Sequence, residues 1–322
     1  MEVRFPTVDI IIPTLNCAKI LDLCLRKISS QVYSGHYRII IVDGGSLDGT
    51  IKIAQKYTKE IFVIPGMYAT GLNGAKHFGE LNSNADLIWH VDSDNILSDE
   101  LVLEKLVEPF VEDKTINISI PTTAVDPFDN LLSKWMSKRE TFFVEEMKKK
   151  SKFVGNYYVI DDMFYGLTNC TIVKRDVLEK VGGYDSDIRT LLRIRKQNLS
   201  KGAIVESAKF YHIQFDSWVM FGKKWLKRAK KFSKMSKIEL GTYFVEYPPS
   251  SIADKQLKTS TVNDIFGSIK LSFRNSILES DLLWLFGIIT SGKINIFQTL
   301  WFETENDKFV VNFKKISSII YM

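Results

Sequence analysis

Two aspartates separated by one residue follow an apolar segment in the sequence IWHVDSDN, residues 88–95. Two unpaired carboxylates that lie side by side repel each other, and a divalent cation between them relieves this repulsion. Oxygen ligands without histidine or cysteine suit Mg²⁺ or Mn²⁺, ions that commonly join protein carboxylates to phosphate groups. Asp92 and Asp94 therefore indicate a cation site, although a turn in which Asp94 caps a helix would use the same two residues.

A second candidate site is the glycine-rich sequence VDGGSLDGT, residues 42–50. Gly44 and Gly45 permit unusual backbone angles and the close approach of a ligand. Asp43 could accept hydrogen bonds from a base or a ribose, and Asp48 could cap the helix that follows. The dinucleotide-binding pattern G-x-G-x-x-G is absent, and a tight turn without a ligand would also explain these residues.

Both sites follow predicted strands in the first half of the chain, where apolar and amphipathic segments alternate. Strands are predicted at residues 8–14, 37–45, 60–66 and 85–95, and helices at 18–31, 47–57, 71–82 and 98–110, the last ended by Pro109. This alternation predicts an α/β fold with a mostly parallel sheet covered on both faces. Ligands of such sheets bind at the carboxyl ends of the strands, where Asp43, Asp92 and Asp94 all lie.

The middle of the chain has a less regular pattern. It predicts a strand at 117–125, a long helix at 131–152, and a strand, a helix and a Gly-Gly turn at 166–187. Near residues 213–217 the composition becomes basic and aromatic. We therefore expect a catalytic domain at 1–215 and a helical region at 216–322.

The bulk composition indicates an ordinary globular protein of a reducing compartment. Of the 322 residues, 45% are hydrophobic and 25% are charged, which is enough apolar sequence for a substantial core. The three cysteines form no CxxC pair and no metal-ligand spacing, which argues against a disulfide framework. The first residues lack the pattern of a secretory signal, so we expect a cytoplasmic protein.

The order and spacing of four segments resemble the family-two glycosyltransferases, which have the GT-A fold. The segments are DIIIPTLN at 9–16, IIIVDGGSLDGT at 39–50, GAKHFG at 74–79 and LIWHVDSDN at 87–95. The resemblance covers residues 8–110 and resumes at 166–202. It implies a Rossmann-like sheet and a metal-dependent enzyme that transfers a sugar from a nucleotide-diphosphate sugar to a hydroxyl acceptor, with inversion. A UDP-sugar is favoured and a GDP-sugar is the alternative.

The same resemblance implies roles for individual residues. The positions that hold the nucleoside are Pro13, Thr14, Asn16, Asp43 and Gly44. Cys17 stands where the family often has a glutamate, and Gly44 where it usually has a second aspartate. Lys76 fits a basic residue near the diphosphate. In the D-x-D sequence of Asp92, Ser93 and Asp94, the last aspartate would hold a Mn²⁺ or Mg²⁺ ion and the first would contact ribose or sugar.

Inverting transfer also needs a base for the acceptor hydroxyl. The family takes it from an acidic pair between a Gly-Gly-aromatic turn, here residues 182–184, and an LRxR helix, here 192–195. Counting back from LRIR makes Asp187 the candidate base, with Ser186 in place of the preceding acid. Asp185 is the competitor, and both aspartates could instead cap the helix. His212 aligns with a histidine that reaches the metal or diphosphate in some relatives, although a structural role would also explain it.

The segment 216–240 carries the basic character of the chain. It has eight basic and two acidic residues, a net charge of +6, against +5 for the whole protein. Its aromatic residues recur near helical spacing, as in a helix that lies on an anionic membrane surface. A helix packed on the catalytic domain would show the same pattern. No nucleic-acid-binding module surrounds it. The apolar segment 282–302 is interrupted by Lys293, so its uncharged stretches are shorter than a membrane span of roughly 20 residues.

These segments favour a peripheral protein on the cytoplasmic membrane face, and they would suit a lipid-linked acceptor or a growing glycan. Two other functions use the same features. A non-catalytic, membrane-associated protein of the GT-A fold would bind sugar nucleotides without transferring them. A nucleotidyltransferase would need a glycine-rich basic loop near the N-terminus, which PTLNCAK at 13–19 does not provide.

Overall fold

The computed structural model of this chain describes residues 4–66, 72–124, 141, 144, 145, 147–164, 170–185 and 187–213. Several expectations lie outside these residues, namely the region 216–322 with its basic and apolar segments, and most of the predicted helix at 131–152. Within the described part, no helix is long and apolar enough to cross a membrane.

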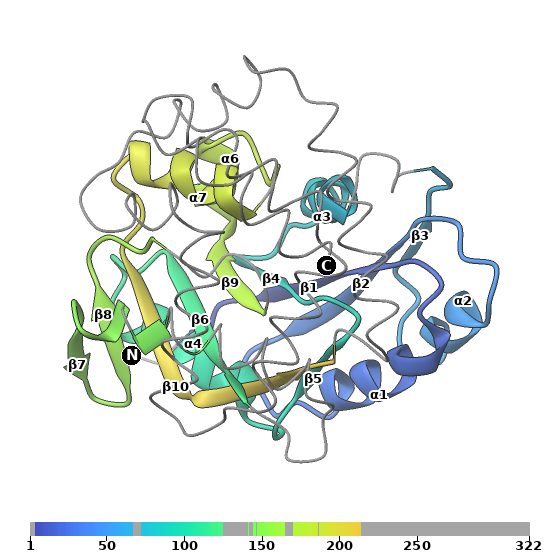
Figure 1. Ribbon diagram of the computed structural model, residues 1–322, viewed down its shortest axis with the longest axis horizontal. Helices are drawn as coiled ribbons and strands as arrows, with labels where there is room; N and C mark the ends of the chain where they lie inside the picture. The colour runs from blue at the N-terminus through green and yellow to red at the C-terminus, as the bar shows by residue number, and fades with distance from the viewer. Residues whose placement is uncertain are drawn as a thin grey trace, which may run out of the picture. The chain divides into compact units, whose positions relative to one another are not determined.

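The described strands form one ten-stranded sheet with the order β3-β2-β1-β4-β9-β6-β10-β8-β7, and β5 pairs with β10 (Figure 1). Their bounds are β1 Val8–Thr14, β2 Tyr37–Asp43, β3 Ile61–Val63, β4 Leu87–His90, β5 Asn95–Leu97, β6 Ile118–Ala124, β7 Lys152–Val154, β8 Tyr157–Ile160, β9 Thr171–Lys174 and β10 Gly202–His212.

The first half of this sheet is parallel, as predicted. β1 pairs in parallel with β2 and β4, and β2 with β3. Beyond β4 the sheet is mixed, because β9 runs antiparallel to both β4 and β6, and β10 is parallel to β6 but antiparallel to β5 and β8. The predicted α/β fold with flanking helices is confirmed.

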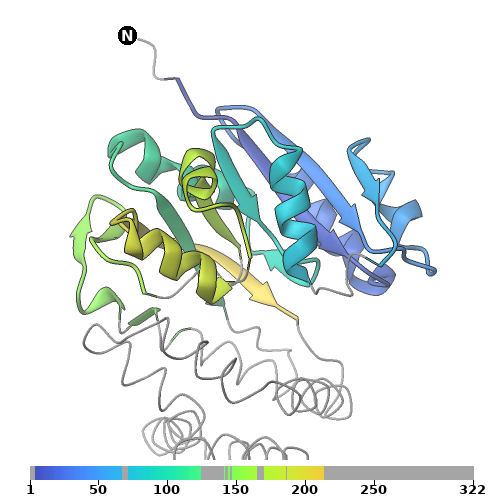
Figure 2. The same ribbon diagram turned by 90° about the horizontal axis from the view of Figure 1, so that it is seen from above.

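Helices cover both faces of the sheet in the described part of the chain. Their bounds are α1 Ala18–Ser29, α2 Thr50–Ala54, α3 Leu72–Leu81, α4 Val102–Glu112, α6 Arg175–Lys180 and α7 Asp187–Lys196. Ile10 and Ile12 of β1 pack on the face of α1 and α4, whereas Ile11 packs on the face of α3, α6 and α7 (Figures 1 and 2). A strand buried on both faces is mostly apolar, which explains the apolar run at residues 10–13 of β1.

Helix α3 lies unusually close to the sheet, because a glycine faces β1. A Cβ atom added to Gly79 would lie 2.4 Å from Cγ2 of Ile11, a separation that requires the helix or the strand to move. Gly79 therefore lets α3 approach β1, and this approach places the side chains of α3 beside the end of β4.

Several predicted boundaries differ from those of the structure, and two of them bear on the core and on the site. Helix α4 does not end at Pro109 but continues to Glu112, with Pro109 inside it. A proline removes one helical hydrogen bond, and here the burial of Leu106 and Phe110 on either side of it favours continuation. The predicted strand at 85–95 ends at His90, so Asp92 and Asp94 lie in the turn between β4 and β5.

Candidate active site

Polar side chains gather at one edge of the sheet, where the parallel strands end. Thr14 is the last residue of β1, Asp43 the last of β2 and His212 the last of β10, and the D-x-D turn follows β4 (Figure 1). Thr14 and Asp43 are direct neighbours across the β1–β2 pairing. The structure thus brings together residues that are up to 198 positions apart in the sequence.

Asp92 faces a lysine of helix α3. Nζ of Lys76 lies 3.1 Å from Oδ1 of Asp92, and the lysine side chain is only 4% exposed. An ammonium group buried to this extent requires a charged partner, because desolvation penalises an unpaired charge by several kcal/mol. Lys76 therefore lies beside the D-x-D sequence, and its expected contact with a diphosphate remains a prediction.

Asp94 faces the histidine at the end of β10. Nε2 of His212 lies 3.6 Å from Oδ1 of Asp94, and the N–H of Ile213 donates to the carbonyl oxygen of Asp94 at 3.0 Å. The pairing of β5 with β10, in which Asn95 lies opposite His212, holds the two side chains side by side. His212 therefore lies beside the D-x-D sequence, and its expected contact with a metal or a diphosphate remains a prediction.

The donor atoms at this edge fit a cation that is only partly held by protein. Among the described residues, no three His, Cys, Asp or Glu side chains converge into a preformed metal site. Mg²⁺ and similar ions commonly take one or two protein ligands and fill the remaining positions with phosphate oxygens and water. Asp94 and His212 offer two ligand atoms in adjacent positions, so they fit an ion that arrives with a diphosphate.

Asp43 is directed at its own loop. It is fully buried, and its carboxylate accepts hydrogen bonds from the hydroxyl of Thr14 at 2.7 Å, from N–H of Gly45 at 2.9 Å, and from N–H and Oγ of Ser46, both at 2.7 Å. These four donors occupy the usual acceptor capacity of a carboxylate. In this structure Asp43 orders the loop after β2, and its contact with a nucleoside remains a prediction.

The loops after β1 and β2 are fastened to each other by side chains. Asn16, at φ +48°, accepts a hydrogen bond from N–H of Leu47 at 2.9 Å and donates its own N–H to Oγ of Ser46 at 2.8 Å. Asp48 accepts from N–H of Ala18 at 3.1 Å and of Thr50 at 3.0 Å, the first residues of α1 and α2. These bonds fix the rim of the edge beside Gly44, whose N–H donates to the carbonyl oxygen of Thr14 at 2.9 Å.

Replacing Asp43 with alanine is expected to lower the free energy of unfolding by at least about 3 kcal/mol, because four donors lose their acceptor. The same variant should bind UDP more weakly even when EDTA removes divalent cations, since the loop beside the nucleoside loses its order. Urea denaturation and calorimetric titration measure the two effects. Asp86→Ala is the control, because exposed Asp86 also accepts two hydrogen bonds, from Thr7, but lies before β4. UDP affinity equal to that of the wild type in Asp43→Ala would exclude Asp43 from nucleoside binding.

The two candidate bases lie on either side of the start of α7. Asp185 is exposed; its carboxylate lies 3.4 Å from Nη1 of Arg189, and its N–H donates to Oγ1 of Thr190 at 3.0 Å. Helix α7 begins at Asp187, whose side chain lies outside the described residues. The choice between Asp187 and Asp185 therefore remains a prediction.

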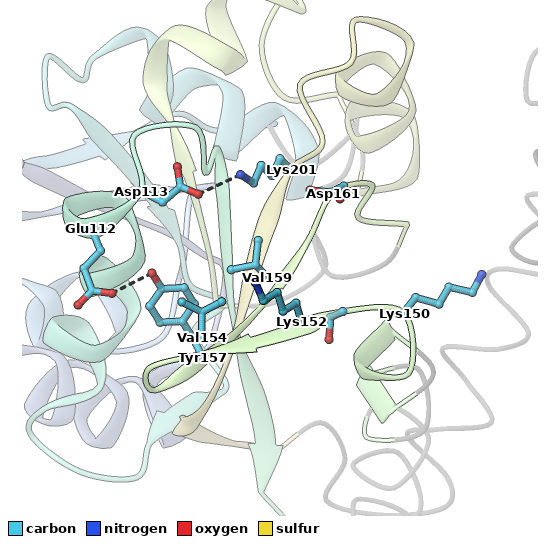
Figure 3. A pocket seen from close by; sticks show the side chains of 10 residues that line it. Glu112, Asp113, Lys150, Lys152, Val154, Tyr157, Val159, Asp161 and Lys201 are labelled. Carbon is cyan, nitrogen blue, oxygen red and sulfur yellow. Dashed lines mark hydrogen bonds and ion pairs between the residues drawn. The ribbon is translucent and has the colours of Figure 1, made fainter.

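One pocket of the described residues lies away from this edge. It measures about 560 Å³ and is lined by Glu112, Asp113, Tyr157 and Lys201, among others (Figure 3). Lys201 precedes β10 and Asp113 follows α4, so the pocket opens at the amino end of β10, opposite the D-x-D edge. In its lining, Lys201 pairs with Asp113 at 2.9 Å, and the hydroxyl of Tyr157 donates to Glu112 at 2.9 Å.

Sequence comparison agrees with this geometry. Residues 9–182 match the model of the family described as Glycosyl transferase family 2. Over 117 residues, or 34% of the chain, the sequence is 32% identical to an N-acetylglucosaminyltransferase of Bradyrhizobium elkanii. The match covers 64% of that relative, so the chain spans less than two thirds of its length.

Structure comparison finds the same fold in solved proteins. TarS 1–349 of S. aureus superposes with a TM-score of 0.51 at 15% identity, covering 84% of this chain and 77% of that one. The same TarS segment in complex with UDP superposes with a TM-score of 0.50 at 14% identity, covering 74% of this chain and 69% of that one. At such identities the likeness shows the fold alone.

Proposed function

The chain belongs to glycosyl transferase family 2, and we propose that it is a metal-dependent enzyme that moves a sugar from a UDP-sugar to a hydroxyl group with inversion. The observation that carries this proposal is the pairing at the carboxyl edge. Asp92 lies against Lys76, and Asp94 lies against His212. The two acids follow β4, His212 ends β10, and Lys76 of α3 lies beside them. Such a set of acidic and basic groups at the carboxyl edge of a sheet suits a ligand that carries a diphosphate.

Each of these residues has a task that its position supports. Asp94 and His212 would hold Mn²⁺ or Mg²⁺, and such an ion neutralises charge on a leaving nucleoside diphosphate. Lys76 adds a fixed positive charge beside Asp92, and its burial strengthens its attraction for a phosphate oxygen. The nucleoside would contact the end of β1 and the loops beside it, through Pro13, Thr14, Asn16, Gly44 and Ser93. Asp187 would accept the proton of the acceptor hydroxyl.

The donor is proposed from the relatives. N-acetylglucosamine is the sugar named for the Bradyrhizobium elkanii protein, and UDP is the nucleotide bound by TarS. A thermal-shift panel of UDP- and GDP-sugars with Mn²⁺ tests the choice, because a ligand that binds only the native state raises the apparent stability. UDP-N-acetylglucosamine should raise the melting temperature most. A larger increase in melting temperature with GDP-mannose would show that the donor nucleotide is GDP and not UDP. No increase with any donor would contradict the proposal.

We also propose that residues 216–240 attach the enzyme to an anionic membrane, where a lipid-linked acceptor would lie. The protein should then sediment with vesicles of phosphatidylglycerol and be released as salt rises, since salt screens surface charges. Changing Lys227, Arg228, Lys230 and Lys231 to glutamine should release it at low salt. The control changes four lysines outside this segment to glutamine and should leave the protein bound to the vesicles. These lysines lie on α1, on α2 and just after α2, and they are Lys19, Lys27, Lys52 and Lys56. Binding that is indifferent to salt and to lipid charge would favour the packed helix.

A further inference from the structure

A buried glutamate on α3 has no part in the proposed chemistry. The side chain of Glu80 is 7% exposed. Its Oε1 lies 3.0 Å from Nε2 of His90, and its Oε2 accepts a hydrogen bond from N–H of Tyr184 at 2.9 Å and lies 3.3 Å from Nδ1 of His77. Burying a carboxylate is unfavourable unless donors surround it. Here the surrounding groups come from three different parts of the fold.

These contacts join α3, the end of β4 and the Gly-Gly-Tyr turn. Glu80 lies on α3, His90 is the last residue of β4, and Tyr184 ends the turn that follows α6. The turn itself is shaped by Gly182 and Gly183, both at positive φ. A Cβ atom on Gly183 would lie 2.3 Å from the ring of His77, so the turn packs directly on α3.

The ring of Tyr184 extends the same connection toward the D-x-D sequence. It makes an edge contact with the ring of His90, with centroids 4.8 Å apart, and Nζ of Lys76 lies 5.2 Å from its centroid. Lys76 lies one helical turn before Glu80 and pairs with Asp92. One face of α3 therefore carries both the contact with Asp92 and the anchor of the turn.

The chain that leaves this turn leads directly to the residues proposed as the base. Asp185 follows Tyr184, and α7 begins at Asp187. Arg193 of α7 donates from Nη2 to the carbonyl oxygen of Gly183 at 2.7 Å, which fastens the helix to the same turn. The location of the base relative to Asp92 and Asp94 thus depends on how the turn is held.

We propose that Glu80 is a positioning residue, which anchors the Gly182–Tyr184 turn to α3 and β4 and so sets the distance between the base and the bound donor. This inference rests on the proposed function. Sequence reasoning missed Glu80 because a glutamate on a helix is usually solvated, and its only signal was the spacing of four residues from Lys76.

The test compares Glu80→Ala with Glu80→Gln. Alanine removes the acceptor of the Tyr184 N–H, whereas the glutamine side-chain oxygen can still accept it. Turnover of UDP-N-acetylglucosamine to UDP and free sugar should fall about 100-fold in Glu80→Ala, because displacement of a reacting group by about 1 Å has that effect. It should stay within about 5-fold of the wild type in Glu80→Gln, since the anchoring hydrogen bond is retained. The affinity for UDP with Mn²⁺ should change by less than about 3-fold in both variants.

Exposed Glu179, one turn before Gly183 and paired with Arg175, is the matched control, and Glu179→Gln should leave every quantity unchanged. If Glu80→Ala does not fold, Gly183→Ala displaces the same turn with Glu80 intact and should give the same separation of turnover from UDP affinity. Two results would overturn the inference. The first is wild-type turnover in Glu80→Ala or, if that variant does not fold, in Gly183→Ala. The second is an equal loss of turnover in Glu80→Gln and Glu80→Ala.

Hydrogen exchange separates failure of this inference from failure of the proposed function. The Tyr184 amide should exchange at least about 10-fold faster in Glu80→Ala than in the wild type, whereas amides of α1 should not change. Unchanged exchange at Tyr184 contradicts the anchor whether or not the protein is active. A wild-type protein that fails to turn over any UDP-sugar contradicts the proposed function, and the exchange result still decides the role of Glu80.

Discussion

Replacing Asp94 with asparagine is expected to weaken Mn²⁺-dependent binding of UDP by at least about 100-fold, because a cation loses several kcal/mol of interaction when a charged ligand becomes neutral. The fold should persist, since the side chain of Asp94 is 30% exposed and its Oδ1 lies 3.6 Å from Nε2 of His212, beyond hydrogen-bond distance. Calorimetric titration of UDP, with Mn²⁺ and with EDTA, measures the effect. The two titrations should become nearly equal in the variant.

Asp161→Asn is the control for this prediction. Asp161 is an exposed carboxylate that lines the pocket of Figure 3, at the opposite edge of the sheet. The Asp161→Asn protein should bind UDP with the affinity of the wild type and with the same dependence on Mn²⁺. An Asp94→Asn protein that retains the full effect of Mn²⁺ would show that the ion is held elsewhere.

Replacing Asp187 with asparagine is expected to lower transfer by roughly 100-fold or more while leaving the affinity for UDP and Mn²⁺ unchanged. Asparagine keeps the shape of the side chain but cannot accept a proton from the acceptor, and loss of a general base has an effect of this size. Turnover of UDP-N-acetylglucosamine at saturating donor measures the loss. Titration of UDP verifies that binding survives.

Asp185→Asn provides the comparison within the same segment. Asp185 is exposed and pairs with Arg189 on the first turn of α7, so its loss should reduce turnover much less. If Asp185→Asn is the slower enzyme, the alignment counted back from LRIR is displaced and Asp185 is the base. If neither variant is slower, the base lies outside this segment.

The parallel half of the fold could be predicted because its signal is local. β1 and β2 each carry a run of apolar residues, 10–13 and 39–42, that ends in a polar residue, so the edge to which they deliver Thr14 and Asp43 follows from the sequence. Strands β5 and β7 were missed, since three residues are too few for periodicity to show. The antiparallel insertion of β9 between β4 and β6 depends on long-range pairing, which no local pattern reveals.

In the candidate site, too, the features with a local sequence signal could be predicted and those that depend on distant contacts could not. Types and spacing selected Asp92 and Asp94, and the resemblance to the family added Lys76, which lies against Asp92 in the structure. They could not show that Asp43 accepts hydrogen bonds from Thr14 and from its own loop, because Ser46 and Gly45 are equally compatible with a bound nucleoside. Nor could they show that Glu80 is buried, since its partners His90 and Tyr184 come from distant parts of the chain.

The central claim is that this carboxyl edge turns over a UDP-sugar with a divalent cation and inverts its anomeric carbon. Proton NMR of UDP-N-acetylglucosamine, whose sugar is α-linked, tests it most directly when spectra are recorded with Mg²⁺ and with EDTA. The predicted result is release of UDP in the sample with Mg²⁺ and not in the sample with EDTA. The free N-acetylglucosamine should first appear as the β anomer, before mutarotation mixes the two anomers. Release of α-N-acetylglucosamine, equal release with EDTA, or no release from any UDP-sugar that binds would contradict the claim.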